Sequence, residues 1–151
     1  MLLLLIIAMS TPVAPTTHAA KKVQISADRV EIIHRSGQVE FSGNVLVVRG
    51  SLKLSCTRLT GRYKDSELIE LNAIGDVKVD KGNMKATAKR AAYDQNQQTL
   101  VLTGQPSLTR NGSRLVGQRI SIWLSSERIV VDKPKGVFDL KQLKQIQPQN
   151  R

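Results

Sequence analysis

Apolar and polar residues alternate along most of the chain. The alternation is clearest at residues 39–41, 52–54, 77–79, 100–102 and 120–124. A period of two is typical of β-strands with one apolar face. Turn-favouring residues interrupt the pattern every 14 to 17 residues, at 35–37, 49–51, 64–66, 81–83, 95–97, 111–112 and 125–127. The pattern predicts an all-β antiparallel meander without a convincing helix.

The segments between these turns are too long to be single straight strands. A dozen residues at about 3.3 Å each would reach about 40 Å, whereas most strands have five or six residues. The apolar face also changes parity in mid-segment, because Ile25 and Ala27 are odd-numbered and Val30 is even-numbered. The same change recurs at 56–59 and 117–120. A β-bulge or corner produces such a change, so we expect each segment to contribute one strand to each of two sheets that meet along a spine.

The chain also contains an internal repeat of 29–32 residues. Four copies share an apolar residue, a small residue two positions later, and an arginine two positions beyond that; the small residues are Ala27, Cys56, Ala88 and Gly117. A second motif, in which an apolar stretch runs into glycine, occurs at Gly43, Gly75 and Gly104, with Lys133 at the corresponding place in the fourth copy. Repeats of this length predict stacked units that share one core and leave open edges at both ends.

The residues on the predicted inner face are almost all aliphatic. They include Val, Leu and Ile from every copy of the repeat, while aromatic residues make up only 3% of the chain. Such an interior suits either a packed sandwich core or a trough that accepts acyl chains, and the residues alone leave both readings open.

The charge of the chain points to an anionic partner. The formal net charge is +11, with 23 Lys and Arg against 12 Asp and Glu, so lipid head groups, acidic glycans and nucleic acids all come into question, as does solubility alone. The scarcity of aromatic residues argues against base stacking, and we expect no nucleic-acid partner.

The first 20 residues are expected to form a secretory signal peptide. Residues 2–9 are an apolar run, and small residues at Ala19 and Ala20 suit cleavage. No Lys or Arg precedes Leu2, so an uncleaved anchor is the alternative. We expect the folded domain to span residues 21–137 and a polar tail to occupy residues 138–151.

The sequence offers no catalytic or metal site. Cys56 is the only cysteine and is expected to be a small buried residue, His34 lacks a supporting acid, and the aspartates are spread singly. We predict no enzyme activity, no cofactor and no metal. The repeated arginines, Arg29, Arg58, Arg90 and Arg119, are expected to lie side by side as a ladder, either with their heads in water or in contact with anionic head groups.

The order and spacing of several motifs resemble the OstA-like family of periplasmic lipopolysaccharide-transport proteins. These motifs are the apolar N-terminal run, Ile-x-Ala-Asp at 25–28, Phe-Ser-Gly-Asn-Val at 41–45, Leu-Thr-Gly at 102–104 and Gly-x-x-Ile at 117–120. The resemblance covers about residues 23–133. It implies a half-open β-jellyroll that holds the acyl chains of lipopolysaccharide, through its lipid A part, in an apolar groove and bridges inner-membrane and outer-membrane transport components in the periplasm.

The resemblance also assigns roles to residues. The groove would be lined by Ile32, Phe41, Val45, Val47, Leu54, Leu59, Val77, Val79, Met84, Leu100, Leu102, Leu108, Ile120 and Ile122. Copies would associate head-to-tail through edges near residues 23–33 and 119–131, using Val23, Ile25, Val30, Ile129 and Val131. Two alternatives remain: a membrane-anchored assembly factor of the same fold, and an exported structural module that binds polyanions.

Overall fold

The computed structural model describes residues 22–136, which form one sheet of eleven strands. The strands are β1 (Gln24–Ser26), β2 (Arg29–Ile33), β3 (Gln38–Arg49), β4 (Leu52–Lys64), β5 (Glu67–Lys81), β6 (Met84–Asp94), β7 (Thr99–Thr103), β8 (Ser107–Arg110), β9 (Ser113–Val116), β10 (Arg119–Trp123) and β11 (Arg128–Asp132), with a 3₁₀ turn η1 at His34–Ser36. All pairings between them are antiparallel. The predicted meander and all seven predicted turns are confirmed.

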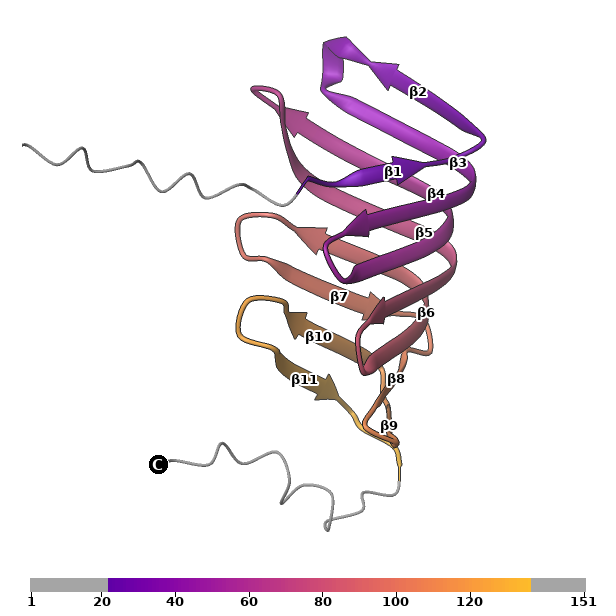
Figure 1. Ribbon diagram of the computed structural model, residues 1–151, viewed down its shortest axis with the longest axis vertical. Helices are drawn as coiled ribbons and strands as arrows, with labels where there is room; N and C mark the ends of the chain where they lie inside the picture. The colour runs from indigo at the N-terminus through magenta and orange to yellow at the C-terminus, as the bar shows by residue number, and fades with distance from the viewer. Residues whose placement is uncertain (1–21, 137–151) are drawn as a thin grey trace, which may run out of the picture.

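The sheet is folded along a spine into two facing halves, as predicted (Figure 1). The β1–β9 half contains β1, β8, β9 and the segments of β3 to β6 at 45–49, 52–55, 77–81 and 84–88. The β2–β11 half contains β2, β7, β10, β11 and the segments at 38–42, 58–64, 67–74 and 90–94. The strands β3 to β6 cross the spine and belong to both halves.

Glycine makes the corner possible in the crossing strands. Register shifts occur at 42–45 and 74–77, where Gly43 has φ 77° and Gly75 has φ 84°. A side chain on Gly75 would place its Cβ 2.7 Å from Thr57 Oγ1, so both the left-handed backbone and the close approach require glycine. At Gly104, with Pro106 following, the corner interrupts the strand altogether and separates β7 from β8.

The open edges differ in part from the prediction. At the N-terminal end β1 and β2 are the outermost strands, as expected. At the other end β11 is outermost in one half, but β10 lies between β7 and β11, so the expected edge at 119–131 is wrong for residues 119–123. In the other half β9 is outermost, and the backbone N–H of Lys135 donates to the carbonyl oxygen of Val116 at 2.7 Å. The segment that follows the predicted turn at 125–127 forms β11 and covers β10.

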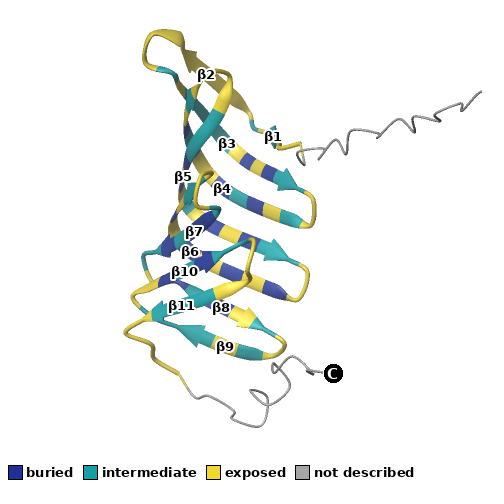
Figure 2. Cartoon of the chain, turned by 90° about the vertical axis from the view of Figure 1, so that its left-hand side faces the viewer, coloured by how far each residue is buried: buried dark blue, intermediate teal, exposed yellow. Residues whose placement is uncertain are grey.

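The core lies between the two halves, and burial alternates along the strands with the period of two that the sequence predicts (Figure 2). Cys56 is buried, as expected, and this burial raises the pKa of its thiol. No helix within residues 22–136 is long and apolar enough to cross a membrane. The predicted signal peptide at 1–20 and tail at 138–151 lie outside the described residues.

Candidate functional site

Two continuous apolar rows run down the inner faces of the halves. In the β2–β11 half, register places Val30, Phe41, Leu59, Ala73, Ala91, Leu102, Ile120 and Val131 opposite one another in successive strands. In the β1–β9 half the corresponding row is Val47, Leu54, Val79, Ala86, Leu108 and Leu115. The repeat therefore produces an unbroken apolar lining along the length of the molecule.

The lining is more deeply buried toward the β11 end than at the β2 end, although Leu115, Ile129 and Val131 of the last layer are only half-buried. Leu102, Leu108 and Ile120 are 0% exposed, because both halves contribute layers around them. Val30 and Ile32 lie on the same face of β2, yet each is 53% exposed, because no strand of the other half covers them. The interior thus opens at the β2 end of the stack.

A small apolar cavity lies between these two ends. Its volume is about 50 Å³, and its walls include Ala73 and Ala91, whose short side chains leave the space unfilled. Leu59, Leu71 and Leu100 complete the apolar wall, and Arg49 and Tyr93 stand at its rim. The two inner faces therefore leave apolar space between them at this level of the stack.

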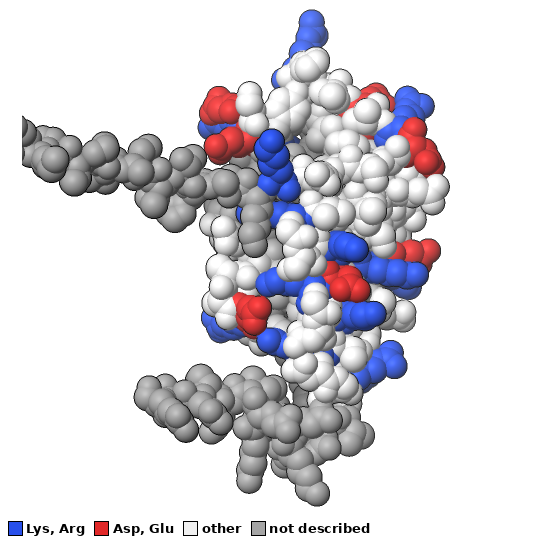
Figure 3. Space-filling model, viewed as in Figure 1, with Lys and Arg blue, Asp and Glu red and all other residues white. Residues whose placement is uncertain are grey.

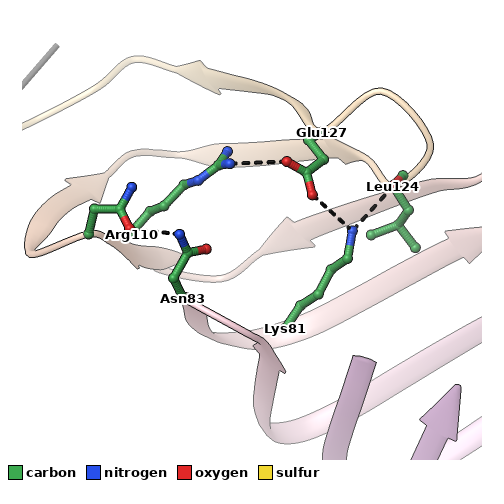
Figure 4. A network of polar contacts seen from close by, with 6 residues as sticks. Lys81, Asn83, Arg110, Leu124 and Glu127 are labelled. Carbon is green, nitrogen blue, oxygen red and sulfur yellow. Dashed lines mark hydrogen bonds and ion pairs between the residues drawn. The ribbon is translucent and has the colours of Figure 1, made fainter. Parts of the chain in front are cut away.

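The mouth, the side opposite the spine, is closed by polar contacts between turns of the two halves. Arg49 donates to the Tyr93 hydroxyl at 2.6 Å, and Arg110 pairs with Glu127 at 3.1 Å. Lys81 lies 3.6 Å from the Glu127 carboxylate and donates to the carbonyl oxygen of Leu124 at 3.4 Å (Figure 4). These contacts connect the two halves of the sheet across the mouth. Water molecules can replace each of the hydrogen bonds and ion pairs.

The predicted groove residues take the inward positions expected for them, with two exceptions in burial. All are buried except Phe41, which is half-buried, and Ile32, which is exposed at the open end. Of the predicted edge residues, Val23 and Val30 are exposed, while Ile25, Ile129 and Val131 are half-buried. The structure brings the two sets together as one surface, because the open end of the lining is formed by the edge strand.

The predicted arginine ladder is wrong in its geometry. The arginines lie on alternate strands, since Ser42 separates Arg29 from Arg58, and Ile74 and Thr103 separate the next pairs. Each repeat contains two segments and only one of them carries the arginine. All four arginines are exposed on the outer face near the spine. A head group that leaves the interior through the mouth emerges on the opposite side of the molecule from them.

Three cations at the mouth were not among the predicted site residues: Arg49, Lys81 and Arg110. Parity could have revealed them, because Arg49 continues the inward series of Val45 and Val47. Each of the three is also the last residue of a strand before a turn. For metal binding, the described residues contain no group of three His, Cys, Asp or Glu side chains that could hold an ion.

Comparison with known proteins agrees with this architecture. The chain is 24% identical over 139 residues to an uncharacterized protein of Rhizobium meliloti strain 1021, a match that covers 85% of this chain and 73% of the relative. Its fold is similar to the crystal structure of LptH from Pseudomonas aeruginosa, described as the LptA-homologous periplasmic component of the lipopolysaccharide transport device. That similarity has a TM-score of 0.69 and 20% identity, and it covers 75% of this chain and 83% of the other.

The family comparison is more specific than either of these relatives. Residues 24–141, which include every strand of the sheet, match the model of the family described as LptA/(LptD N-terminal domain) LPS transport protein. The chain therefore belongs to this family, and it is a lipopolysaccharide-transport protein rather than an enzyme.

Proposed function

We propose that this protein is an exported periplasmic carrier that passes lipopolysaccharide from inner-membrane to outer-membrane components. Acyl chains would lie between the two halves of the sheet, and copies would join head-to-tail through their edge strands. The observation that carries the proposal is the continuous apolar lining that ends in the exposed Val30 and Ile32 of the edge strand. In a closed core, polar side chains would cover the lining at this end.

Opening of the mouth is compatible with the energies of the contacts that close it. The ion pairs of Glu127 with Lys81 and Arg110 are partly exposed to water, and such pairs contribute about 1 kcal/mol or less. Acyl chains that enter would bury their own apolar surface at about 25 cal/mol per Å². The gain from burying several acyl chains exceeds the cost of breaking these contacts.

The number of strands favours head-to-tail assembly. The β2–β11 half contains eight strands in the order β2, β3, β4, β5, β6, β7, β10, β11, each antiparallel to the next. Because the number is even, β2 and β11 run in opposite directions. The β2 strand of a second copy could therefore add to β11 and continue the antiparallel order and the apolar lining without a break.

The test of lipid binding is site-specific photo-crosslinking in a cell that makes lipopolysaccharide. A benzophenone-bearing amino acid would replace Phe41 or Leu52, which face inward and are half-buried, so that the probe fits without overpacking the core. Ser42 and Lys53, their neighbours on the outer face, are the matched controls. We expect lipopolysaccharide adducts at the inner positions alone. Folded, exported protein without adducts at the inner positions would refute the proposal.

One observation favours a second candidate, a structural module that binds polyanions. Lys and Arg outnumber Asp and Glu on the face seen in Figure 3, and Lys53, Lys78 and Lys85 lie exposed on the outer side of the β1–β9 half. This candidate predicts salt-sensitive binding to acidic polymers and no lipid adducts in the same experiment. A third candidate, the membrane-anchored assembly factor, predicts a mature protein that still begins with residues 1–20.

A further inference from the structure

A row of basic side chains forms the inner rim of the mouth. Register places Arg49, Leu52, Lys81, Met84 and Arg110 opposite one another on successive strands. Leu52 and Met84 belong to the inner face, so the cations that pair with them share that face. Neighbouring strands are about 4.8 Å apart, and the cations therefore recur about every 10 Å along the rim, in three of the four copies of the repeat.

These cations have few counter-charges. Arg49 contacts the neutral groups of Tyr93 and Gln95, at 2.6 and 3.4 Å. Lys81 and Arg110 share a single carboxylate, that of Glu127, at 3.6 and 3.1 Å (Figure 4). Among the described residues, three positive charges thus face one negative charge at the mouth.

The cations are also partly withdrawn from solvent, which strengthens their attraction for an anion. The side chains of Lys81 and Arg110 are 26% and 30% exposed, whereas that of Glu127 is 60% exposed. The carboxylate therefore reaches in from the solvent side and could leave the rim without losing contact with water.

The rim adjoins both a polar hollow and the apolar cavity. A hollow of about 200 Å³ lies between Arg49 and Lys81, large enough for several water molecules and hence for a phosphate group. Arg49, Leu52 and Tyr93 line this hollow and also the apolar cavity below it. The two spaces are thus in contact, polar at the mouth and apolar inside, as an amphiphile with an anionic head would require.

We propose that Arg49, Lys81 and Arg110 bind the phosphate groups of the lipid whose acyl chains occupy the interior, and that Glu127 holds Lys81 and Arg110 until a phosphate displaces it. This inference rests on the proposed function, because it assumes that acyl chains enter the groove. A phosphate carries more charge than a carboxylate and offers more acceptor oxygens, and arginine binds it in a bidentate manner. The four repeated arginines, at positions 29, 58, 90 and 119, lie on the outer face and do not contribute to this phosphate site.

The test compares the lipid binding of two triple variants of the full chain. The rim variant combines Arg49→Gln, Lys81→Met and Arg110→Gln. The control variant combines Lys53→Met, Lys78→Met and Arg114→Gln, which removes the same charge from exposed positions outside the rim. Circular dichroism establishes that each variant is folded. The probes are bisphosphorylated lipid A, the same lipid with both phosphates removed, and inorganic phosphate, at about 0.15 M salt.

The wild-type protein should bind phosphorylated lipid A more tightly than dephosphorylated lipid A. If each rim cation contributes about fivefold, the rim variant loses on the order of a hundredfold in affinity for the phosphorylated lipid and keeps its affinity for the dephosphorylated one. The control variant should retain the preference to within about twofold. Glu127→Gln should strengthen binding of the phosphorylated lipid about threefold, because it removes the competing carboxylate.

Each contrary outcome has a distinct meaning. A preference that survives in the rim variant, or equal binding of the two lipids by the wild type, overturns the rim inference and leaves the proposed function standing. Binding of inorganic phosphate that the rim variant loses, together with equal binding of the two lipids by the wild type, identifies free phosphate as the ligand and overturns the assignment to a lipid. A wild-type protein that binds neither lipid refutes the proposed function itself.

Discussion

Alanine at Gly75 should cost more stability than alanine at any glycine that lies in an open turn. Gly75 has φ 84° at the corner of β5, and Gly82 has φ 61° in the turn between β5 and β6. Both positions therefore impose the left-handed backbone on alanine, at a cost of about 1 kcal/mol. They differ in their surroundings, since a Cβ at Gly82 meets nothing within 4 Å, whereas one at Gly75 lies 2.7 and 2.9 Å from Thr57 Oγ1 and Cβ.

The additional cost at Gly75 follows from that crowding. Carbon atoms pack at about 3.5–4.0 Å, so Thr57 or the corner itself must shift by more than half an ångström, and overpacking of this kind costs about 1–3 kcal/mol. We therefore expect Gly75→Ala to lower the free energy of unfolding by about 2–4 kcal/mol and Gly82→Ala by about 1 kcal/mol.

Urea unfolding measures the difference directly. Trp123, the single tryptophan, lies on β10 and reports unfolding by fluorescence, with far-ultraviolet circular dichroism as a second probe. Combining Gly75→Ala with Thr57→Ala should recover part of the extra cost, because Oγ1 is the nearest atom. Equal losses at Gly75 and Gly82 would show that the close approach of the two segments does not shape the spine.

Three further predictions concern assembly, packing and the buried thiol. Ile32→Lys should abolish self-association in sedimentation experiments, whereas Ile33→Lys, 47% exposed on the opposite face, should leave it unchanged; equal effects would contradict association through the lining. Leu102→Ala should cost about 3–5 kcal/mol in urea unfolding, because the side chain is fully buried, while Thr103→Ala should cost less than about 1 kcal/mol. Burial raises the pKa of the Cys56 thiol, so the folded state holds this proton more tightly than the unfolded state. The stability it contributes is present at neutral pH and is lost as the pH rises above about 8.5; a Cys56→Ala variant should lack this alkaline loss in unfolding experiments.

Local patterns account for the strands, the turns and the bend. The inward side of a strand follows from its period of two, so residues such as Val45 and Val47 can be assigned to the inner face from the alternation alone. The change of parity between Ala27 and Val30 locates the spine, because a bulge or corner shifts the inward residues from odd-numbered to even-numbered positions. The seven turns follow from residues that accept turn conformations, such as Gly50 and Gly82.

Other features depend on contacts between residues far apart in the chain. Leu102 and Ile32 are both aliphatic and both face inward, yet one is fully buried and the other 53% exposed. The difference arises from what the opposite half places in front of each side chain, and no local pattern contains this information. The prediction of an arginine ladder was wrong for a related reason. Which side chains are neighbours across the sheet depends on which segments pair, and the repeat alone does not specify this.

The sequence by itself determined the fold class, the repeat, the inner face and the family resemblance. Each of these rests on the geometry of a strand and on its period, which a few consecutive residues specify. The tertiary structure alone decided which inward side chains are buried and which, at the β2 end, remain exposed. It also brought Arg49 to Tyr93 and Lys81 to Glu127 across the mouth. Those contacts join turns more than 40 residues apart, and their positions depend on how sharply the whole sheet folds about its spine.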